Sequence, residues 1–280
     1  MKKLDKIILT GAAGALGAQL RKPLTKLCNN LLSTDINADV GELYAGESFV
    51  QADLSHLESM MSICEGADMI VHFGAIGNEA PFDDILQSNI VGAYNIWEAA
   101  YRSGVRRIVY ASSIHAVGMH LKRDFIGTDV PHRPDTFYGL AKCFAEDLGS
   151  LYWDKRGLES VHLRILSCSG PVTNARALGS WLSYDDLVHL VERAIDTPTV
   201  GFSIIYGVSN NDRTPVDNSK ASFLGYRPSD NAEIFSAEIL EKEPYHDPND
   251  PGMIWHGGPF ASAEIGSRGI VTINRGNGKD

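Results

Sequence analysis

The sequence predicts an α/β protein built on a doubly wound parallel sheet, and three features of the chain lead to this fold class. Short apolar runs alternate with helix-like segments through the first two-thirds of the 280 residues, an order typical of parallel sheets with right-handed crossovers. The first apolar run leads through a glycine-rich loop into a helix. Polar or glycine residues follow several of the runs, at the sheet edge where ligands bind in such folds.

Each apolar run is short and carries few charges, as expected of strands buried on both faces. The predicted strands span residues 6–10, 30–34, 48–51, 69–73, 107–111, 161–165 and 202–206. The predicted helices span residues 15–27, 55–64, 84–102, 137–155 and 184–196, with two short helical pieces near residues 217 and 231. We therefore expect a Rossmann-type domain over residues 1–170 and a small, interleaved substrate-binding lobe over residues 171–262. Residues 263–280 are polar and glycine-rich, which predicts a poorly ordered tail.

Gly11, Gly14 and Gly17 form a G-x-x-G-x-x-G loop between the first predicted strand and the first helix. Glycines let the backbone turn tightly and approach a pyrophosphate, whose charge is favoured at a helix N-terminus. The spacing differs from the commoner G-x-G-x-x-G, and the alternative is an ordinary strand-to-helix turn. The context of strand, glycine loop and helix favours a dinucleotide site.

Asp35 ends the second apolar run, about 20 residues beyond the glycine loop. A carboxylate at this place accepts hydrogen bonds from a ribose 2′-hydroxyl and repels a 2′-phosphate. Asp35 therefore predicts NAD rather than NADP as the cofactor, and the alternative is a strand-end Asp that only closes a turn. Asp53, Gly74, Ser113 and Ser167 also fall at predicted strand ends, and we expect them along the same sheet edge.

Tyr138 and Lys142 are four residues apart on a predicted helix, and Ser112-Ser113 follows the fifth predicted strand. Positions i and i+4 share a helix face, so the Lys142 ammonium can stand beside the Tyr138 phenol. A fixed cation favours phenolate, which should lower the pKa of Tyr138 from its ordinary value of about 10. The motif alone is short enough to occur by chance. Together with the glycine loop, it predicts removal of a proton from a hydroxyl group.

Composition excludes several classes of function. Hydrophobic content of 44% and charged content of 21% are typical of a soluble globular protein, and a net charge of −10 argues against a nucleic-acid surface. No apolar run has transmembrane or signal-peptide character, so we expect no membrane partner. The four cysteines lack C-x-x-C spacing and are expected to be reduced, which indicates the cytoplasm. His246, Asp247, Asp250 and His256 fit no metal-binding spacing, so residues 246–258 predict a polar loop and no metal site.

These residues give the chain a specific resemblance to the extended short-chain dehydrogenase/reductase family. The motifs that carry it are the glycine loop, Asp35, Asp53-Leu54, Asn89, Ser112-Ser113, Tyr138-x-x-x-Lys142, and Arg164 leading to Gly170-Pro171. Within that family the chain resembles most the bacterial uronate dehydrogenases, through stretches that run over most of the chain from about residue 6 to residue 260.

The resemblance implies NAD-dependent oxidation of a hexuronic acid, galacturonate or glucuronate, at the anomeric carbon, giving an aldarolactone. It also implies homo-oligomers. Ser113, Tyr138 and Lys142 would be catalytic, with Tyr138 as the base. The implied cofactor-binding residues are Gly11, Gly14, Leu16, Gly17, Asp35, Asp53, Leu54, Gly74, Asn89, Tyr138 and Lys142. The implied substrate-binding residues are Ser113, His115, Tyr138, Ser167 and Arg176, of which Arg176 would bind the substrate carboxylate.

Three of these residues have a plainer alternative. Asn89 would brace backbone or water near Lys142, or would be a helix residue satisfied by the main chain. His115 is expected to be a wall residue that binds substrate, not a proton carrier. Arg176 taken alone could be a surface arginine in a loop, but the resemblance favours a role in binding the substrate carboxylate.

The chain departs from the family pattern at Ile114, where the family has Asn, and at Gly77, where it has Ser. We expect both changes to remove polar groups from the substrate pocket, and a sugar hydroxyl left without a partner loses roughly 1–3 kcal/mol. A neutral aldose is therefore an alternative substrate. A sugar-nucleotide epimerase or dehydratase, and a non-enzymatic dinucleotide sensor on the same fold, are further alternatives.

Overall fold

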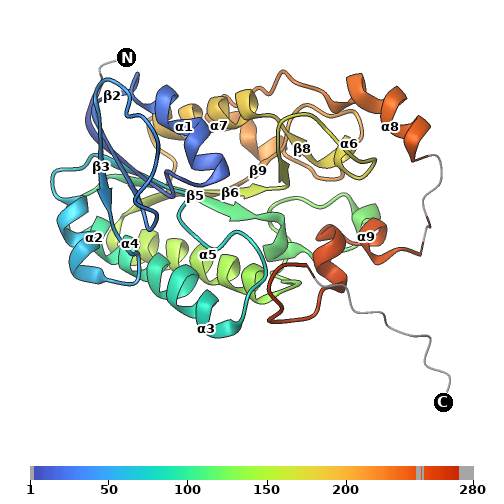
Figure 1. Cartoon of the computed structure of the whole chain (residues 1–280), viewed down its shortest axis with the longest axis horizontal. Coiled ribbons are helices and arrows are strands. Elements are labelled where there is room, and N and C mark those ends of the chain that lie inside the picture. The colour runs from blue at the N-terminus through green and yellow to red at the C-terminus, as the bar shows by residue number, and fades with distance from the viewer. Residues whose placement is uncertain (1–2, 244–246, 248, 271–280) are drawn as a thin grey trace.

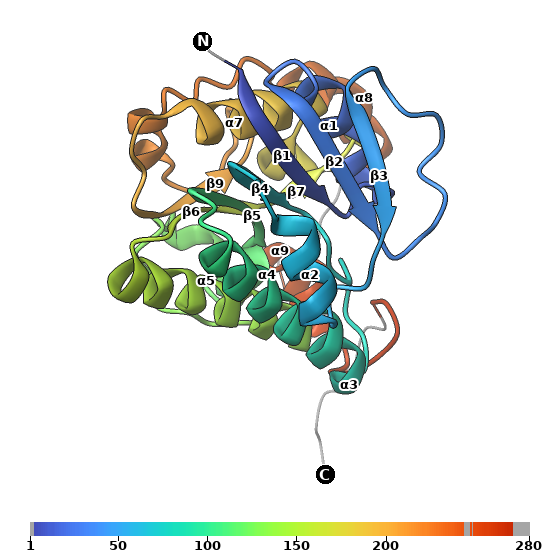
Figure 2. The ribbon, with the colours of Figure 1, turned by 90° about the vertical axis from the view of Figure 1, so that its left-hand side faces the viewer.

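The polypeptide folds around a seven-stranded parallel sheet (Figures 1 and 2). The computed structural model describes residues 3–243, 247 and 249–270. The strands are β1 (Leu4–Thr10), β2 (Cys28–Asp35), β3 (Glu47–Gln51), β4 (Met69–His72), β5 (Arg107–Ser113), β6 (Glu159–Ile165) and β9 (Phe202–Gly207). Their spatial order is β3-β2-β1-β4-β5-β6-β9, and every neighbouring pair is parallel. The predicted doubly wound sheet is confirmed.

Helices cover both faces of the sheet (Figure 2). They are α1 (Ala15–Leu24), α2 (Leu57–Cys64), α3 (Phe82–Ile85), α4 (Gly92–Arg102), α5 (Phe137–Arg156), α6 (Ala177–Ser180), α7 (Tyr184–Asp196), α8 (Ser236–Lys242) and α9 (Pro251–Ile254). Helices α1 and α7 pack on one face, and α2, α4 and α5 pack on the other. Within the described part of the chain, none of the helices combines the length and the apolar character needed to cross a bilayer.

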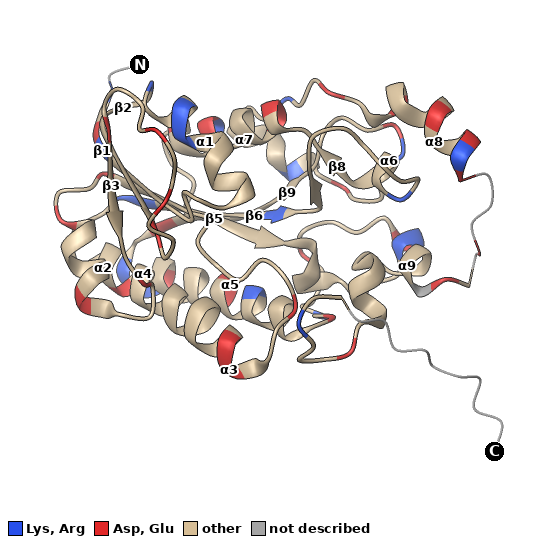
Figure 3. Ribbon diagram, in the orientation of Figure 1, with Lys and Arg blue, Asp and Glu red and all other residues tan. Residues whose placement is uncertain are grey.

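The core consists of two apolar layers, one on each side of the sheet. Successive side chains of a strand point to opposite faces, so Ile7 and Leu9 contribute to the α1–α7 layer and Ile8 to the other. All three side chains are fully buried. This double burial explains why the strands appear in the sequence as continuous apolar runs. Acidic residues lie outside these layers, on α2, α3, α7 and α8 among other elements (Figure 3).

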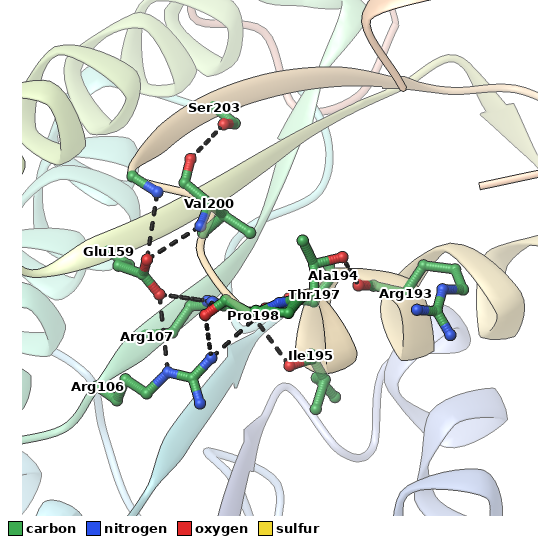
Figure 4. A network of polar contacts seen from close by, with 11 residues as sticks. Arg106, Arg107, Glu159, Arg193, Ala194, Ile195, Thr197, Pro198, Val200 and Ser203 are labelled. Atoms are coloured by element: carbon green, nitrogen blue, oxygen red, sulfur yellow. Dashed lines mark hydrogen bonds and ion pairs between the residues drawn. The ribbon is translucent and has the colours of Figure 1, made fainter. Parts of the chain in front are cut away.

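A buried ion pair fastens the N-terminal edge of the sheet (Figure 4). The guanidinium of Arg107, at the start of β5, donates to a Glu159 carboxylate oxygen at 2.9 Å and to carbonyls at the end of α7, including Ala194 O at 2.8 Å. Glu159 also accepts a hydrogen bond from Val200 N at 2.9 Å. Burial lowers the pKa of Arg107, and Glu159 opposes that shift. These contacts join β5, β6 and α7 at the edge opposite the ends where ligands bind.

The order in which strands are added to the sheet reverses between β1 and β4, because β2 and β3 lie on one side of β1 and the later strands lie on the other. Gly74, just beyond β4, donates its N–H to Thr10 Oγ1 at 3.0 Å, so the carboxyl ends of the two strands are held together. A crevice outside the strand ends at such a switch point is the general ligand site of this architecture.

Three segments differ from the sequence expectations. The predicted helix over 84–102 is interrupted by a π-helical stretch, Leu86–Val91, between α3 and α4. The predicted loop over 246–258 contains α9, because Asp250 caps its start by accepting from Gly252 N at 2.8 Å. His246 lies outside the described residues.

The third difference is at the predicted tail, whose first residues are held against the domain. The carboxylate of the buried Glu79 accepts a hydrogen bond from Gly266 N at 2.7 Å, and the Glu79 carbonyl accepts from Gly269 N at 3.0 Å. Arg268 pairs with Asp84 at 2.9 Å. A glycine-rich segment gave no local sign of these contacts, which join residues nearly 190 positions apart. Residues 271–280 lie outside the described part of the chain.

Candidate active site

The glycine loop leaves no room for a side chain at Gly11 or Gly17. Gly11 has a φ of +73°, and a Cβ on Gly17 would lie 2.0 Å from Gly11 O. The first intrahelical bond runs from Ala18 N to Gly14 O at 2.9 Å. The N–H groups of the first turn of α1 therefore have no acceptor within the helix and can bind an anion, which the helix dipole also favours.

A cleft of about 470 Å³ opens beside this loop. The predicted cofactor residues that line it are Gly11, Gly14, Asp35, Asp53, Leu54 and Gly74. The Asp35 carboxylate accepts hydrogen bonds from Ala13 N at 3.0 Å and Asn37 N at 2.9 Å, so it is fixed at the mouth of the loop. The cleft thus offers N–H donors near a helix N-terminus and a carboxylate at the end of β2, the set that a pyrophosphate and a ribose diol require.

A second cavity, of about 530 Å³, adjoins the first and shares Gly11 and Gly14 with it. The predicted residues that line it are Leu16, Gly17, Ser113, His115, Tyr138, Lys142 and Ser167. Gly77 and Phe260 also line it. Residues from the glycine loop, β5, α5 and the C-terminal segment therefore meet around one space next to the dinucleotide cleft.

Tyr138 and Lys142 occupy the first turns of α5, which begins at a capped N-terminus. Thr136 Oγ1 accepts a hydrogen bond from Gly139 N at 3.0 Å. Lys142 Nζ donates to Ala111 O at 2.7 Å and to the buried Tyr110 hydroxyl at 3.2 Å, and it lies 5.3 Å from the centroid of the Tyr138 ring. The two motif residues thus share a helix face, as the spacing predicted.

The pKa of Tyr138 moves in the direction opposite to the sequence expectation. Burial raises it to about 12, and a hydrogen bond with Ser113 opposes the rise. Burial also lowers the pKa of Lys142 to about 7, against the pull of Glu146. The ammonium is directed at Ala111 O and Tyr110, so desolvation of the phenol outweighs the neighbouring cation.

Behind Lys142 lies a buried polar network that local sequence did not reveal. Glu146, one turn further along α5, accepts hydrogen bonds from Ser112 Oγ at 2.6 Å and Arg164 Nη2 at 2.8 Å, and its other contact is with His132 Nε2 at 2.8 Å. Hydrogen bonds from His132 and Arg164 hold the pKa of Glu146 at about 2, although burial opposes this. The network fixes the end of β5 and the base of α5, from which Ser113 and Lys142 project.

Glu146→Gln should destabilise the fold most at neutral pH. Its carboxylate titrates at about 2 when folded and near 4.5 when unfolded, so its contribution is complete above pH 4.5 and lost as pH falls toward 2. Removing the charge leaves Arg164 unpaired, at roughly 3–5 kcal/mol. Urea unfolding should give the wild type a larger free energy of unfolding than Glu146→Gln at pH 7, and the difference should become smaller below pH 4.5. Glu238→Gln, in an exposed pair with Lys242, is the control and should leave unfolding unchanged. A difference in the free energy of unfolding that does not change with pH would contradict the role of the ionised Glu146 carboxylate.

Glu79 is a second residue that sequence reasoning missed. Its carboxylate accepts hydrogen bonds from Phe137 N at 3.3 Å and Tyr138 N at 3.0 Å, at the positive end of α5. The same carboxylate holds Gly266, so one buried side chain connects the start of α5 to the C-terminal segment. Phe260 stands on that segment and closes one side of the second cavity.

Arg176 does not line the second cavity but lies directly behind its wall. Its guanidinium donates to His256 O at 2.9 Å and to Ser167 Oγ, a lining residue, at 3.5 Å. Burial lowers the pKa of Arg176, and Asp135 opposes the shift. Among the ion pairs of residues 3–243, 247 and 249–270, none includes Arg176. A largely buried guanidinium without a carboxylate partner favours an anionic ligand.

Asn89 and Ile114 lie outside both cavities. The Asn89 amide accepts from Ile76 N at 2.8 Å and donates to Ile76 O at 3.0 Å, so it braces the main chain after β4 and is placed to support the cleft indirectly. Ile114 packs in an apolar cluster with Val117 and Tyr206. Ile114 therefore lines neither cavity, and its effect on the polarity of the substrate pocket relative to the family stays a prediction. Gly77 does line the cavity, and a Cβ there would meet nothing within 4 Å.

Comparison with known proteins gives consistent similarities. Residues 7–197 match the NAD-dependent epimerase/dehydratase family. The chain is 42% identical to uronate dehydrogenase of Pseudomonas putida over 259 residues, 92% of this chain and 96% of that protein. It superposes with a TM-score of 0.91 on glucuronic acid dehydrogenase from Chromohalobacter salexigens, with 41% identity, 94% of this chain and 98% of that chain. It superposes with a TM-score of 0.90 on a mutant uronate dehydrogenase from Agrobacterium tumefaciens complexed with NAD. The two are 41% identical, and the match covers 93% of this chain and 98% of that chain.

Proposed function

The chain belongs to the NAD-dependent epimerase/dehydratase family, and we propose that it is an NAD-dependent dehydrogenase that oxidises a hexuronic acid at its anomeric carbon to the aldarolactone. The resemblance to the extended short-chain dehydrogenase/reductase family is confirmed. The observation that carries the proposal is the meeting of Tyr138, Ser113 and Lys142 in a cavity that shares its wall with the dinucleotide cleft. A hydroxyl bound there would lie between a proton acceptor and the cofactor.

The cleft fits NAD through the chemistry of its own groups. The pyrophosphate would be held by the N–H groups at the start of α1, and the adenosine ribose by Asp35, which lines the cleft. Leu54 and Gly74 would form walls of the same cleft. When bound, NAD supplies the hydride acceptor.

The proton step belongs to Tyr138. Its phenol oxygen would take the proton of the anomeric hydroxyl, while the Ser113 hydroxyl holds the same oxygen in place. Because burial raises the pKa of Tyr138 to about 12, the phenolate needs cationic support close by. Lys142 Nζ lies 5.3 Å from the centroid of the Tyr138 ring and can give that support when it is protonated. Lys142 would also contact the nicotinamide ribose.

Asp35→Asn should weaken the preference for NAD over NADP. The amide keeps an oxygen that can accept from Ala13 N but loses the charge that repels a 2′-phosphate. A hydrogen bond to a charged group contributes about 1.5–3 kcal/mol, so the ratio of kcat/KM for NAD to that for NADP should fall roughly 10- to 100-fold. Initial rates with both cofactors measure it. Asp39→Asn, in a neighbouring loop that lines neither cavity, is the matched control. An unchanged ratio in Asp35→Asn would remove this residue from the cofactor site.

One assay tests the proposed function. Purified protein is incubated with NAD and galacturonate, glucuronate or the corresponding neutral hexoses, and reduced cofactor is followed by absorbance. We expect net NADH release with at least one uronate and slower reaction with neutral hexoses. Faster reaction with the hexoses would identify a neutral aldose dehydrogenase. Turnover of a sugar nucleotide without net NADH would identify an epimerase or dehydratase, and cofactor binding without any turnover would identify a sensor.

Three further features belong to the same proposal. Residues 171–262 would act as a substrate-binding lobe, with α7 and β9 of this range built into the main domain. Homo-oligomers are supported by exposed apolar side chains on α4 and α5, including Tyr94, Leu140 and Leu151. A cytoplasmic location is supported by the four free cysteines.

A further inference from the structure

We propose that Asp135 is a positioning residue that holds His115 as the Nδ1–H tautomer, so that His115 Nε2 faces the second cavity as an acceptor for a substrate hydroxyl. The proposal rests on the proposed function only in taking the ligand to be a sugar. Asp135 lies in none of the sequence motifs, and its role follows from where the fold places it.

The contact between the two residues is short and shielded from water. His115 Nδ1 and Asp135 Oδ2 are 2.7 Å apart, and the two side chains are 11% and 0% exposed. The other carboxylate oxygen, Oδ1, accepts from Thr136 Oγ1 at 2.9 Å. An ionised carboxylate can only accept hydrogen bonds. His115 Nδ1 must therefore donate, and in the neutral ring Nε2 then carries no hydrogen.

The Asp135 carboxylate is closely packed by the residues around it. The charge of Asp135 acts on Arg176, raising the pKa of that guanidinium against the effect of burial. A Cβ on either Gly118 or Gly257 would lie 2.0 Å from Asp135 Oδ2. Gly257 N donates to Gly118 O at 2.9 Å, so both glycines are themselves fixed around the carboxylate. Asp135 Oδ2 therefore occupies the space that a side chain at either position would need.

The His115 imidazole also packs against two aromatic rings. It stacks on Phe260 with ring centroids 3.8 Å apart and an interplanar angle of 28°, and it meets Tyr138 edge-on at 5.7 Å. His115 N donates to Ser113 Oγ at 3.3 Å. His115 lines the cavity, and the hydrogen bonds of the described residues give Nε2 no protein partner. Its acceptor is therefore available to a ligand beside the proposed base.

The wild-type protein itself provides the first test. ¹⁵N NMR of histidine-labelled protein, with the His115 signals identified by their loss in His115→Gln, reports which ring nitrogen carries hydrogen. We expect hydrogen on Nδ1 and none on Nε2 at the pH of activity. Hydrogen on Nε2, in the other tautomer or in the imidazolium, would overturn the proposal. This readout needs no turnover, so failure of the proposed sugar oxidation and failure of this proposal are distinguishable.

Asp135→Asn provides the second test, because its amide can donate to Nδ1 and force hydrogen onto Nε2, as in the known effect of the same substitution in a catalytic triad. We expect the tautomer to switch and the KM for the uronate to rise roughly 10- to 100-fold, with the Kd of NAD changed less than about twofold. In a His115→Ala background, Asp135→Asn should have little further effect on KM. An equal loss with and without His115 would show that Asp135 acts only on the fold and would overturn the positioning role. If Asp135→Asn does not fold, the ¹⁵N NMR spectrum of the wild type still shows which tautomer His115 adopts.

Discussion

Tyr138→Phe should reduce kcat by about 10²- to 10⁴-fold, the usual contribution of a positioned acid or base. The substitution removes one oxygen and leaves the ring that meets His115 edge-on and lies beneath Lys142 Nζ. The main-chain contact of Tyr138 N with Glu79 is also retained. Steady-state rates with NAD and a uronate, together with NAD titration by calorimetry, measure the two effects separately. The Kd of NAD should change by no more than about twofold, because the groups proposed to hold the pyrophosphate and ribose are untouched.

Tyr101→Phe is the matched control for this experiment. Tyr101 stands on α4 and lines neither active-site cavity, and its hydroxyl contacts Arg156 at 3.1 Å on the surface. Its loss should leave kcat unchanged. Equal turnover in Tyr138→Phe and the wild type would end the assignment of Tyr138 as the base.

Arg176→Ala should raise the KM for uronates roughly 10- to 100-fold and affect neutral aldoses much less. Arg176 is the largely buried guanidinium directly behind Ser167, and a charge-assisted hydrogen bond to a carboxylate contributes about 1.5–3 kcal/mol. Arg176→Lys should recover only part of the affinity, because an ammonium cannot form the two parallel hydrogen bonds of a guanidinium. Initial-rate series with each uronate and its neutral hexose give the comparison.

Arg176 also supports its surroundings through His256 O, so unfolding should be measured in parallel. Arg213→Ala, which removes an exposed arginine paired with Glu233, controls for loss of positive charge and should leave both KM values unchanged. If Arg176→Ala raised the KM for uronates and neutral aldoses by the same factor, recognition of the carboxylate by this residue would be excluded.

Much of the fold could be predicted from the sequence because its strands are buried on both faces. Their centres are then continuously apolar, as at residues 7–9, and the glycine loop marks the turn into the first helix. Lys142 and Tyr138 could be paired because helix periodicity alone puts them on one face. The location of the cofactor cleft could be predicted because alternating strands and helices indicate a parallel sheet, and the carboxyl ends of parallel strands meet at one edge.

The parts that could not be predicted depend on contacts between distant residues or on burial. Phe260 reaches the cavity only because the C-terminal segment returns to Glu79, and no local pattern encodes that return. Asp135 sits beside the motif, but its contact with His115 is set by tertiary packing. The predicted direction of the Tyr138 pKa shift was wrong. The sequence shows a cation one turn away, but it does not show the desolvation of the phenol.

Ile114 illustrates a related limit. It is adjacent to Ser113 in the sequence, which suggested a shared pocket, but the chain turns after β5 and directs the two side chains to different places. Ser113 lines the second cavity, whereas Ile114 enters an apolar cluster. Of the two departures, Gly77 is the one that lines the cavity, and a Cβ built on it would meet nothing within 4 Å.

The fate of the hydrogen on the anomeric carbon tests the proposed oxidation most directly. Uronate carrying deuterium at the anomeric carbon is incubated with the protein and NAD, and the released cofactor and the sugar product are analysed by mass spectrometry. Oxidation at that carbon predicts one deuterium in the reduced cofactor and none in the lactone. Deuterium retained in the sugar, with turnover observed, would place the chemistry at another carbon and contradict the reaction proposed for Tyr138 and its neighbours.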